Sequence, residues 1–368
     1  MKNVNLVTII VFITFIFGLT IFDLLKPPTE ISMDERRKLA QIPEVSIEKI
    51  FDGTFAGDYA VFLQDQVVFR DDLRSLKAFI EFKLLRKKEN NGVYVIGDDI
   101  YDKFYGINQH YLDRAAGLID NIIGLINSDK VYLSIIPSKA HMLDRDEYLL
   151  SDQNMIADFF EQHTSSSYID IMNLYEQGDG DLYYRTDHHW TTQGAIKAYR
   201  ELITAMGYEP VDKYDYEEFT DTFVGSNYGK AASSSIEKDT IYLAHNEYLD
   251  NMSVCRYATA DTFNFFNSIY FREKVGGFDP YDVFIGGAGP ITVIENDRTQ
   301  SDEELIIFKD SYSHALAPFL AQHFKTVTLY DLRYVRKELI FDNFDLTGKT
   351  ILFLYSTTIL NTDPQILN

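Results

Sequence analysis

The chain has 368 residues, of which 46% are hydrophobic and 14% aromatic, so it can bury a sizeable core and is neither disordered nor a small disulfide scaffold. Acidic residues outnumber basic ones by 56 to 34, and the resulting formal charge of -22 repels phosphate backbones. We therefore expect no nucleic-acid partner. Cys255 is the single cysteine, which excludes an intrachain disulfide and any multi-thiolate metal site.

The first predicted element is a membrane-spanning helix from Leu6 to Leu25. Asp23 is the only charge in this run, and about 20 residues of helix match the roughly 30 Å hydrocarbon core of a bilayer. Because no small-residue cleavage site follows, we expect an uncleaved signal anchor. The sequence thus predicts an anchor at 1–25, a stem at 26–60 and a large extracytoplasmic domain, although the basic residues after the anchor favour the opposite orientation.

The remainder, residues 61–368, is predicted to form one α/β domain. After a helical stretch at 55–87 and a hairpin at 93–104, strands and helices alternate, which predicts a mainly parallel sheet covered by helices on both faces. Between 212 and 300 the pattern breaks into short strand-like pieces, which we interpret as an insertion that shapes the site. The strands are expected at Val131–Ile136, Tyr168–Ile171, Glu304–Phe308, Thr326–Tyr330 and Thr350–Tyr355, and the helices at 110–127, 153–163, Thr191–Met206, 313–324 and 333–340.

One candidate site is the segment Asp187-His188-His189-Trp190, between a Gly/Asp-rich loop and an amphipathic helix. A loop that enters a helix is where open α/β sheets place functional groups. An arbitrary Asp-x-His pattern could instead be a helix cap beside a partly buried imidazole. The paired imidazoles and the tryptophan favour a functional role, and since adjacent histidines normally diverge, we expect no shared metal ion.

A second candidate site is Ser311, where an apolar strand ends and a helix begins. A serine at such a turn points its hydroxyl out of the sheet, and the helix N-terminus offers backbone N–H groups to an oxyanion. The serine could instead only cap the helix. Together the two segments supply a serine nucleophile, an imidazole base and a carboxylate to orient it, which is the set that acyl transfer requires.

Six spaced motifs follow one another along the chain: Asp34–Ala40, Asp65–Asp71, Asn91–Val95, Ile136–Lys139, Asp187–Trp190 and Lys309–Tyr312. In this order they resemble the DHHW family, from about residue 34 to the C-terminus. That family is similar to the SGNH-hydrolase-like O-acetyltransferases of the AlgJ and AlgX type, in which the Asp-x-His segment precedes the serine segment as if circularly permuted. The resemblance implies a three-layer SGNH-hydrolase-like α/β domain.

The resemblance also implies roles for single residues: Ser311 as nucleophile, His189 as general base and Asp187 as its orienting carboxylate. The glycine that usually opens the serine motif is absent, and beyond the backbone N–H of Ser311 the sequence does not place an oxyanion hole. A strand precedes Arg333 at the expected C-terminal edge of the sheet, so Arg333 could line the acceptor site or make a structural salt bridge. The candidate substrate-binding residues are Arg333, Tyr334, Trp190 and Tyr312.

These observations predict a membrane-anchored, extracytoplasmic O-acetyltransferase that acts through an acyl-serine on hydroxyls of an exopolysaccharide or cell-envelope glycan, without a metal or cofactor. Since acetyl-CoA is not expected outside the membrane, the resemblance implies an MBOAT-type membrane acyltransferase as the acetyl donor. The same residues could pass the acetyl group to water, as in a carbohydrate acetylesterase. If they are only structural, the chain is a non-catalytic glycan-binding or scaffold protein of a polysaccharide export system.

Overall fold

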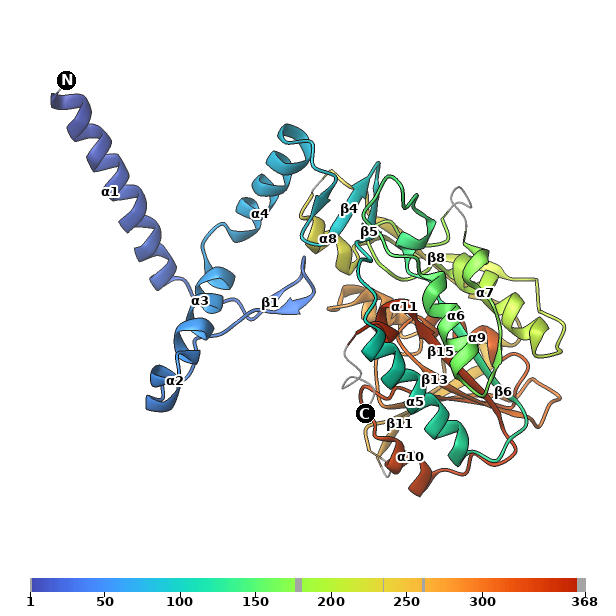
Figure 1. Ribbon diagram of the computed structural model, residues 1–368. Helices are drawn as coiled ribbons and strands as arrows, with labels where there is room; N and C mark the ends of the chain where they lie inside the picture. The colour runs from blue at the N-terminus through green and yellow to red at the C-terminus, as the bar shows by residue number, and fades with distance from the viewer. Residues whose placement is uncertain (1, 176–180, 234, 260–261, 363–368) are drawn as a thin grey trace. The chain divides into compact units, whose positions relative to one another are not determined.

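The computed structural model describes residues 2–175, 181–233, 235–259 and 262–362 (Figure 1). The chain forms two compact units. The first consists of Met1–Asn91 with Tyr228–Ile236, and the second of Gly92–Asn227 with Glu237–Asn368. The candidate site residues all belong to the second unit.

The first unit is built from short elements that follow the N-terminal helix. The single helical stretch expected at 55–87 is interrupted before Arg70, because Phe69 adopts a left-handed backbone with φ 56°. Among the described residues, no helix combines the length and the apolar character needed to cross a membrane. The elements are α1 (Lys2–Leu25), β1 (Ile31–Ser32), β2 (Arg37–Lys38), α2 (Ile47–Phe51), α3 (Thr54–Gln66), α4 (Arg70–Phe79), a π-helical turn (Ile80–Leu84) and β3 (Glu89–Asn90).

A buried carboxylate, Asp65, ties the start of this unit to α3. Its oxygens accept two bonds from the Arg37 guanidinium, at 2.7 and 2.5 Å, and one from the backbone N–H of Ala40 at 2.8 Å. Hydrogen bonding from Arg37 lowers the pKa of Asp65 to about 2. A second ion pair joins Arg70 to Glu35. The motifs around Asp34 and Asp65 therefore form a structural ion-pair cluster.

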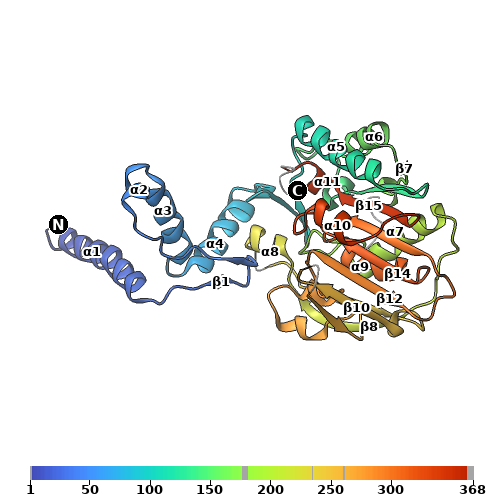
Figure 2. The ribbon, with the colours of Figure 1, turned by 90° about the horizontal axis from the view of Figure 1, so that it is seen from below.

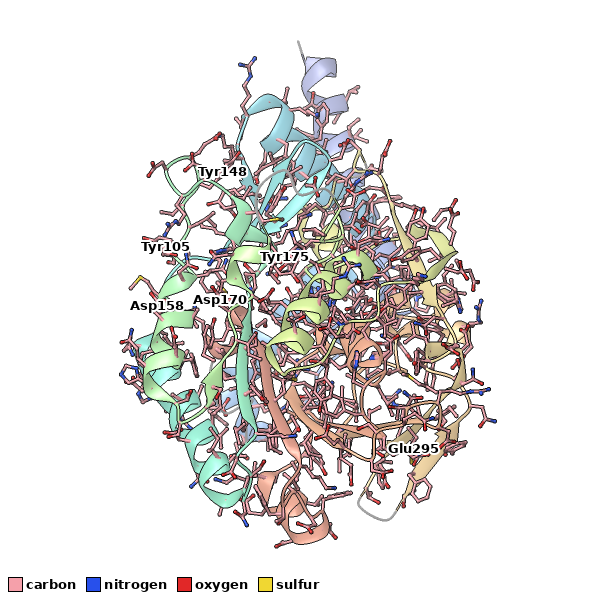
Figure 3. All side chains as sticks on the ribbon, turned by 90° about the vertical axis from the view of Figure 1, so that its right-hand side faces the viewer. Tyr105, Tyr148, Asp158, Asp170, Tyr175 and Glu295 are labelled. Atoms are coloured by element: carbon pink, nitrogen blue, oxygen red, sulfur yellow. The ribbon has the colours of Figure 1, made fainter. Side chains whose placement is uncertain are left out.

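The second unit contains an eight-stranded sheet in the order β11-β10-β12-β14-β13-β15-β6-β7. From β14 to β7 the neighbours run parallel, whereas β12, β10 and β11 are antiparallel to their neighbours. Figure 2 shows β10, β12 and β14 side by side, and Figure 3 labels Glu295 on β12. The predicted α/β fold with a mainly parallel sheet is confirmed. The strands are β6 (Val131–Ile136), β7 (Ser167–Tyr168), β10 (Met252–Tyr257), β11 (Phe263–Phe266), β12 (Ile291–Asn296), β13 (Glu304–Lys309), β14 (Thr326–Tyr330) and β15 (Thr350–Ser356).

Helices cover both faces of this sheet. Helices α7 and α9 pack with Ile307 and Leu354 on one face, and α5, α6 and α10 pack with Phe308 and Phe353 on the other. The alternation of side chains along each strand produces the two cores. The other strands of this unit form the hairpin β4 (Val93–Ile96) with β5 (Asp99–Asp102) and the antiparallel pair β8 (Asp215–Phe223) with β9 (Asp239–His245). Its helices are α5 (Gln109–Leu125), α6 (Asn154–His163), α7 (Thr192–Ala205), α8 (Ser226–Ala231, shared with the first unit), α9 (Ser313–Leu320), α10 (Lys337–Asn343) and α11 (Thr357–Leu360).

The largest differences between predicted and observed bounds are in β7, α9 and α10. Helix α9 ends at Leu320 and not at 324. Strand β7 ends at Tyr168 because Asp170 turns the chain, its carboxylate accepting from the N–H of Met172 at 2.8 Å. Helix α10 begins at Lys337 and not near 333, since the preceding residues form a turn closed by the N–H of Tyr334 and the carbonyl of Asp331, 2.9 Å apart.

The strand directions place several segments at one edge of the sheet. The parallel strands β13, β14 and β15 all end there, and β12, which runs the other way, begins there with Ile291 opposite Tyr330. Strand β10 ends at the same edge, with Tyr257 opposite Ile291. Three strands from the predicted insertion at 212–300 thus extend the sheet beside the candidate serine.

Candidate active site

Three side chains from two distant segments meet at this edge. The Oγ of Ser311, in the turn between β13 and α9, lies 2.8 Å from Nε2 of His189. The Nδ1 of the same ring lies 2.6 Å from Oδ1 of Asp187. Because a carboxylate only accepts, Nδ1 carries the proton and Nε2 is free to accept from the serine hydroxyl. The expected convergence of these residues is confirmed, and the arrangement is that of a nucleophile, a base and an orienting carboxylate.

Backbone groups fix the carboxylate of Asp187. Its Oδ1 also accepts from the N–H of His189 at 3.0 Å, and Oδ2 accepts from the N–H of Ser226 at 2.7 Å. Gly225 packs directly on it: a Cβ at position 225 would lie 2.2 Å from the Cβ of Asp187. Only glycine fits this approach, so the loop before α8 holds Asp187 in place.

An aromatic ring covers the imidazole of His189. Tyr281 stacks on it with ring centroids 4.0 Å apart and planes 7° apart. Burial, helped by the neighbouring imidazole of His188, lowers the pKa of His189 to about 4. The ring is therefore neutral near pH 7 and ready to accept a proton. Sequence reasoning missed Tyr281, which lies in the irregular segment where no periodicity marks a packed residue.

Asp310 holds the turn that carries Ser311. One carboxylate oxygen accepts from the N–H of Tyr312 at 3.1 Å and the other from the N–H of Ser356, at the end of β15, at 2.7 Å. The N–H of His314 donates to the carbonyl of Ser311 at 3.1 Å. These bonds fix the backbone on both sides of the serine and tie it to the neighbouring strand.

Arg333 makes the salt bridge that the sequence left as an alternative. Its Nε and Nη2 donate to the carboxylate of Asp331 at 2.8 and 2.6 Å. The buried Nζ of Lys309 lies 3.2 Å from the same carboxylate and 2.8 Å from Nε2 of His314. Tyr334, the next residue, is 57% exposed, so this candidate substrate-binding residue remains accessible.

Trp190 and Tyr312 lie inside the protein and not on a substrate surface. The Nε1 of Trp190 donates to the carbonyl of Tyr312 at 2.9 Å, and the hydroxyl of Tyr312 donates to the carbonyl of His188 at 2.7 Å. Tyr175 (Figure 3) packs on Trp190 with ring centroids 6.3 Å apart. Because both side chains are buried, we correct the predicted substrate contact: they connect the serine turn to the histidine segment.

His188 and His189 do not diverge as expected. Their ring centroids are 3.9 Å apart, and a contact of 3.0 Å between Nδ1 of His188 and Oγ of Ser226 holds the first ring in that position. Together with Asp187 they offer ligand atoms within 4.8 Å of one another. This group is where a metal ion could bind, in competition with the bond between Asp187 and His189.

The chain is similar to known proteins over most of its length. The family model described as "DHHW protein" matches residues 85–330, and a search of curated proteins found no match. A DHHW family protein from Eubacterium siraeum DSM 15702 superposes with a TM-score of 0.60 at 22% identity, covering 76% of this chain and 95% of that one. Bacillus cereus PatB1, solved with a sulfonyl adduct, gives 0.58 at 19% identity, covering 74% and 98%.

The O-acetyltransferase domain of Pseudomonas putida AlgJ is also similar, with a TM-score of 0.44 at 15% identity, over 75% of this chain and 97% of that one. The likeness to the Eubacterium siraeum protein and to PatB1 shows a shared fold. The family model covers more than half of the chain and includes the complete Asp187–Trp190 segment and Ser311. The chain therefore belongs to the DHHW family.

Proposed function

We propose that this protein is an O-acetyltransferase that works through an acetyl-serine. The observation that carries the proposal is the hydrogen-bonded line from Asp187 through His189 to Ser311. His189 removes the hydroxyl proton as Ser311 attacks the acyl carbon of a donor ester, and Asp187 stabilises the imidazolium that forms. The donor alcohol leaves with that proton. A sugar hydroxyl then gives its proton to His189, attacks the acetyl carbon and regenerates the serine.

We place this reaction outside the cytoplasm, with an exopolysaccharide or cell-envelope glycan as acceptor. The apolar run from Leu6 to Leu25 supports attachment to a membrane through the N-terminus. A donor on the far side of the membrane requires a protein that passes acetyl groups across, and we propose an MBOAT-type membrane acyltransferase for that role. Protection of the large domain from protease added outside intact cells would contradict this location.

Covalent labelling of the full chain tests the nucleophile. An activated acetyl ester such as 4-nitrophenyl acetate should place one acetyl group on Ser311, detected by mass spectrometry of the intact protein and its peptides, and a sulfonyl fluoride should block that position. Ser311→Ala should abolish labelling. Ser313→Ala is a matched control, because Ser313 lies two residues further on, at the start of α9, with its hydroxyl buried. Acetylation that persists in Ser311→Ala contradicts the proposal.

The fate of the acetyl group separates transfer from hydrolysis. With oligosaccharides present, an O-acetyltransferase forms acetylated sugar at the expense of free acetate. Acetate release that no glycan changes identifies a carbohydrate acetylesterase, which uses the same three residues. Glycan binding without any acetylation of Ser311 identifies a non-catalytic binding or scaffold protein.

A further inference from the structure

A groove of about 730 Å³ opens at the same sheet edge as Ser311. Part of its lining comes from three strand ends: Tyr257 ends β10, Pro290 and Ile291 lie at the start of β12, and Tyr334 follows β14. Helix α10 supplies another part through Glu338, Leu339, Asp342 and Asn343. All of these residues belong to the second unit. The groove therefore has a defined position relative to the candidate catalytic residues.

The register of the sheet gives the lateral separation between the groove residues and the strand that precedes Ser311. Ile291 pairs with Tyr330, and Tyr330 pairs with Phe308, which precedes Ser311 by one short turn. With neighbouring strands about 4.8 Å apart, Ile291 lies roughly 10 Å and Tyr257 roughly 14 Å across the sheet from Phe308. A single sugar ring bound at Ser311 does not span that distance, whereas a short oligosaccharide does.

Contacts through Asp331 join the groove to the strand that precedes the serine, because Nζ of Lys309, the last residue of β13, lies 3.2 Å from the Asp331 carboxylate. The N–H of Asp331 donates to the carbonyl of the groove residue Pro290 at 3.1 Å. The carboxylate of Asp331 binds Arg333, whose guanidinium carbon lies 5.6 Å from the ring centroid of Tyr334. Asp331 thus contacts groove residue Pro290, Lys309 at the end of β13, and Arg333, which lies against the ring of Tyr334.

The groove has the chemistry of a carbohydrate subsite. The ring of Tyr334 is 57% exposed, and the C–H face of a pyranose packs on such a ring while polar groups around it bind the sugar hydroxyls. Arg336, Glu338 and Asp342 supply those groups. Arg336 is the one cation among these three groups, against the two carboxylates of Glu338 and Asp342, and the whole chain has a formal charge of -22. Because both charges are negative, the groove repels a polyuronate.

We propose that this groove binds the acceptor glycan several sugar rings away from the acetylated hydroxyl, so that the preferred acceptor is an uncharged chain of at least three sugars. The inference rests on the proposed function. It adds a distal subsite that contains Tyr334 and a preference for acceptor length and charge.

The test uses the full chain, 4-nitrophenyl acetate as donor, and chito-oligosaccharides from the monomer to the hexamer as acceptors. The measured quantity is the ratio of kcat/KM for the pentamer to that for the dimer. We expect a ratio of roughly ten, equivalent to about 1.4 kcal/mol, and weak acceptance of oligogalacturonates of equal length. Tyr334→Ala and Leu339→Trp, which narrows the groove, should bring the ratio close to one. Leu149→Trp is the matched control, since Leu149 is an exposed leucine of the same unit away from the groove.

Calorimetric titration of the chito-pentamer provides a second readout that needs no catalysis. Transfer without length dependence overturns the subsite and leaves the proposed function standing. Pentamer binding that Tyr334→Ala weakens, without transfer to any glycan, supports the subsite and rejects the transferase. A preference for oligogalacturonates, or length dependence that Tyr334→Ala and Leu339→Trp retain, overturns the subsite.

Discussion

Replacement of Gly225 by alanine probes whether the position of Asp187 controls the reaction. The new Cβ would lie 2.2 Å from the Cβ and 2.5 Å from the Cα of Asp187, and 2.4 Å from the carbonyl oxygen of Thr186, whereas ordinary contacts begin at 3.4 Å. These atoms belong to the backbone or are attached directly to it, so a rotamer change does not relieve the overlap. Asp187 must shift by roughly 1 Å, and a displacement of that size at a catalytic group costs on the order of 100-fold in rate.

The same shift acts on bonds that orient the base. The 2.6 Å contact from Asp187 to Nδ1 of His189 and the 2.7 Å bond from the N–H of Ser226 both depend on the present position of the carboxylate. Overpacking at one buried position costs about 1–3 kcal/mol of stability, which a folded domain tolerates. We therefore expect a large loss in kcat with a modest fall in the thermal unfolding midpoint.

The assay is the rate at which Ser311 is acetylated by 4-nitrophenyl acetate, followed by release of nitrophenol. Gly276→Ala is the matched control, because no atom of the described residues, apart from its neighbours in the chain, lies within 4 Å of the position its Cβ would occupy, and it should retain the full rate. If Gly225→Ala acetylates Ser311 as fast as the unmodified protein while remaining folded, the position of Asp187 does not limit the chemistry.

Four further predictions test the site and the first unit. Only neutral His189 acts as a base, and its pKa is lowered to about 4. The rate of Ser311 acetylation should therefore stay constant from about pH 7 to 5 and be lost as the pH falls through about 4. A rate that halves near pH 6.5, the ordinary pKa of histidine, would contradict this. Asp187→Asn should lower kcat on the order of 10⁴-fold by favouring the wrong imidazole tautomer, and a loss below tenfold would count against an orienting role. The described residues offer no hydrogen-bond partner to the hydroxyl of Tyr281, so Tyr281→Phe should leave the protein's stability in thermal unfolding unchanged or raise it by up to about 1 kcal/mol. Tyr281→Ala should expose His189 and shift the loss of acetylation at low pH to a higher pH. An unchanged pH profile would show that the ring does not shield the base. Arg37 lowers the pKa of Asp65 in the folded protein from 3.8 to about 2. The pair should therefore stabilise the protein above about pH 4 and progressively less towards pH 2. If the thermal unfolding midpoint of Asp65→Asn falls with acid in the same way as that of the unmodified protein, this prediction is wrong.

Regular patterns allowed much of the second unit to be predicted. The strand Val131–Ile136 occurs with the predicted bounds, because a continuous apolar run between turns leaves little choice of boundary. The two candidate segments could be recognised because each pairs reactive side chains with the start of a helix. The distance of 2.8 Å between Nε2 of His189 and Oγ of Ser311 depends on the order of the strands in the sheet. The periodicity of one sequence does not encode that order.

Burial and long-range packing limited the prediction of the site. Trp190 and Tyr312 look like substrate contacts in the sequence because they neighbour the reactive residues, yet both rings are buried. Tyr281 stacks on His189 from a segment without periodicity. The structural salt bridge that the sequence offered for Arg333 is formed, with Asp331 two residues before it. For Trp190, Tyr312 and Tyr281, the contacts that decide their roles join residues far apart in the sequence, which local patterns treat separately.

Two buried charges bind the backbone of the segment before Asp187. The Nζ of Lys139 donates to the carbonyls of Tyr184 and Arg185 at 2.9 and 3.3 Å. The carboxylate of Asp239 accepts from the N–H groups of Arg185 and Thr186 at 2.7 and 2.8 Å. Burial lowers the pKa of Lys139 and raises that of Asp239, a cost that these backbone bonds offset.

The same two charges reach the glycine that packs on Asp187. The hydroxyl of Thr186 donates to Asp239 at 2.5 Å and accepts from the N–H of Gly225 at 2.8 Å. Backbone carbonyls and amides of this segment thus bond to ions that are themselves buried, and a movement of the loop would break these bonds at a cost in free energy. The Lys139 motif, to which the sequence assigned no role, therefore helps to hold Asp187, and this is the physical reason why an added methyl group at Gly225 has no free space into which the backbone can relax.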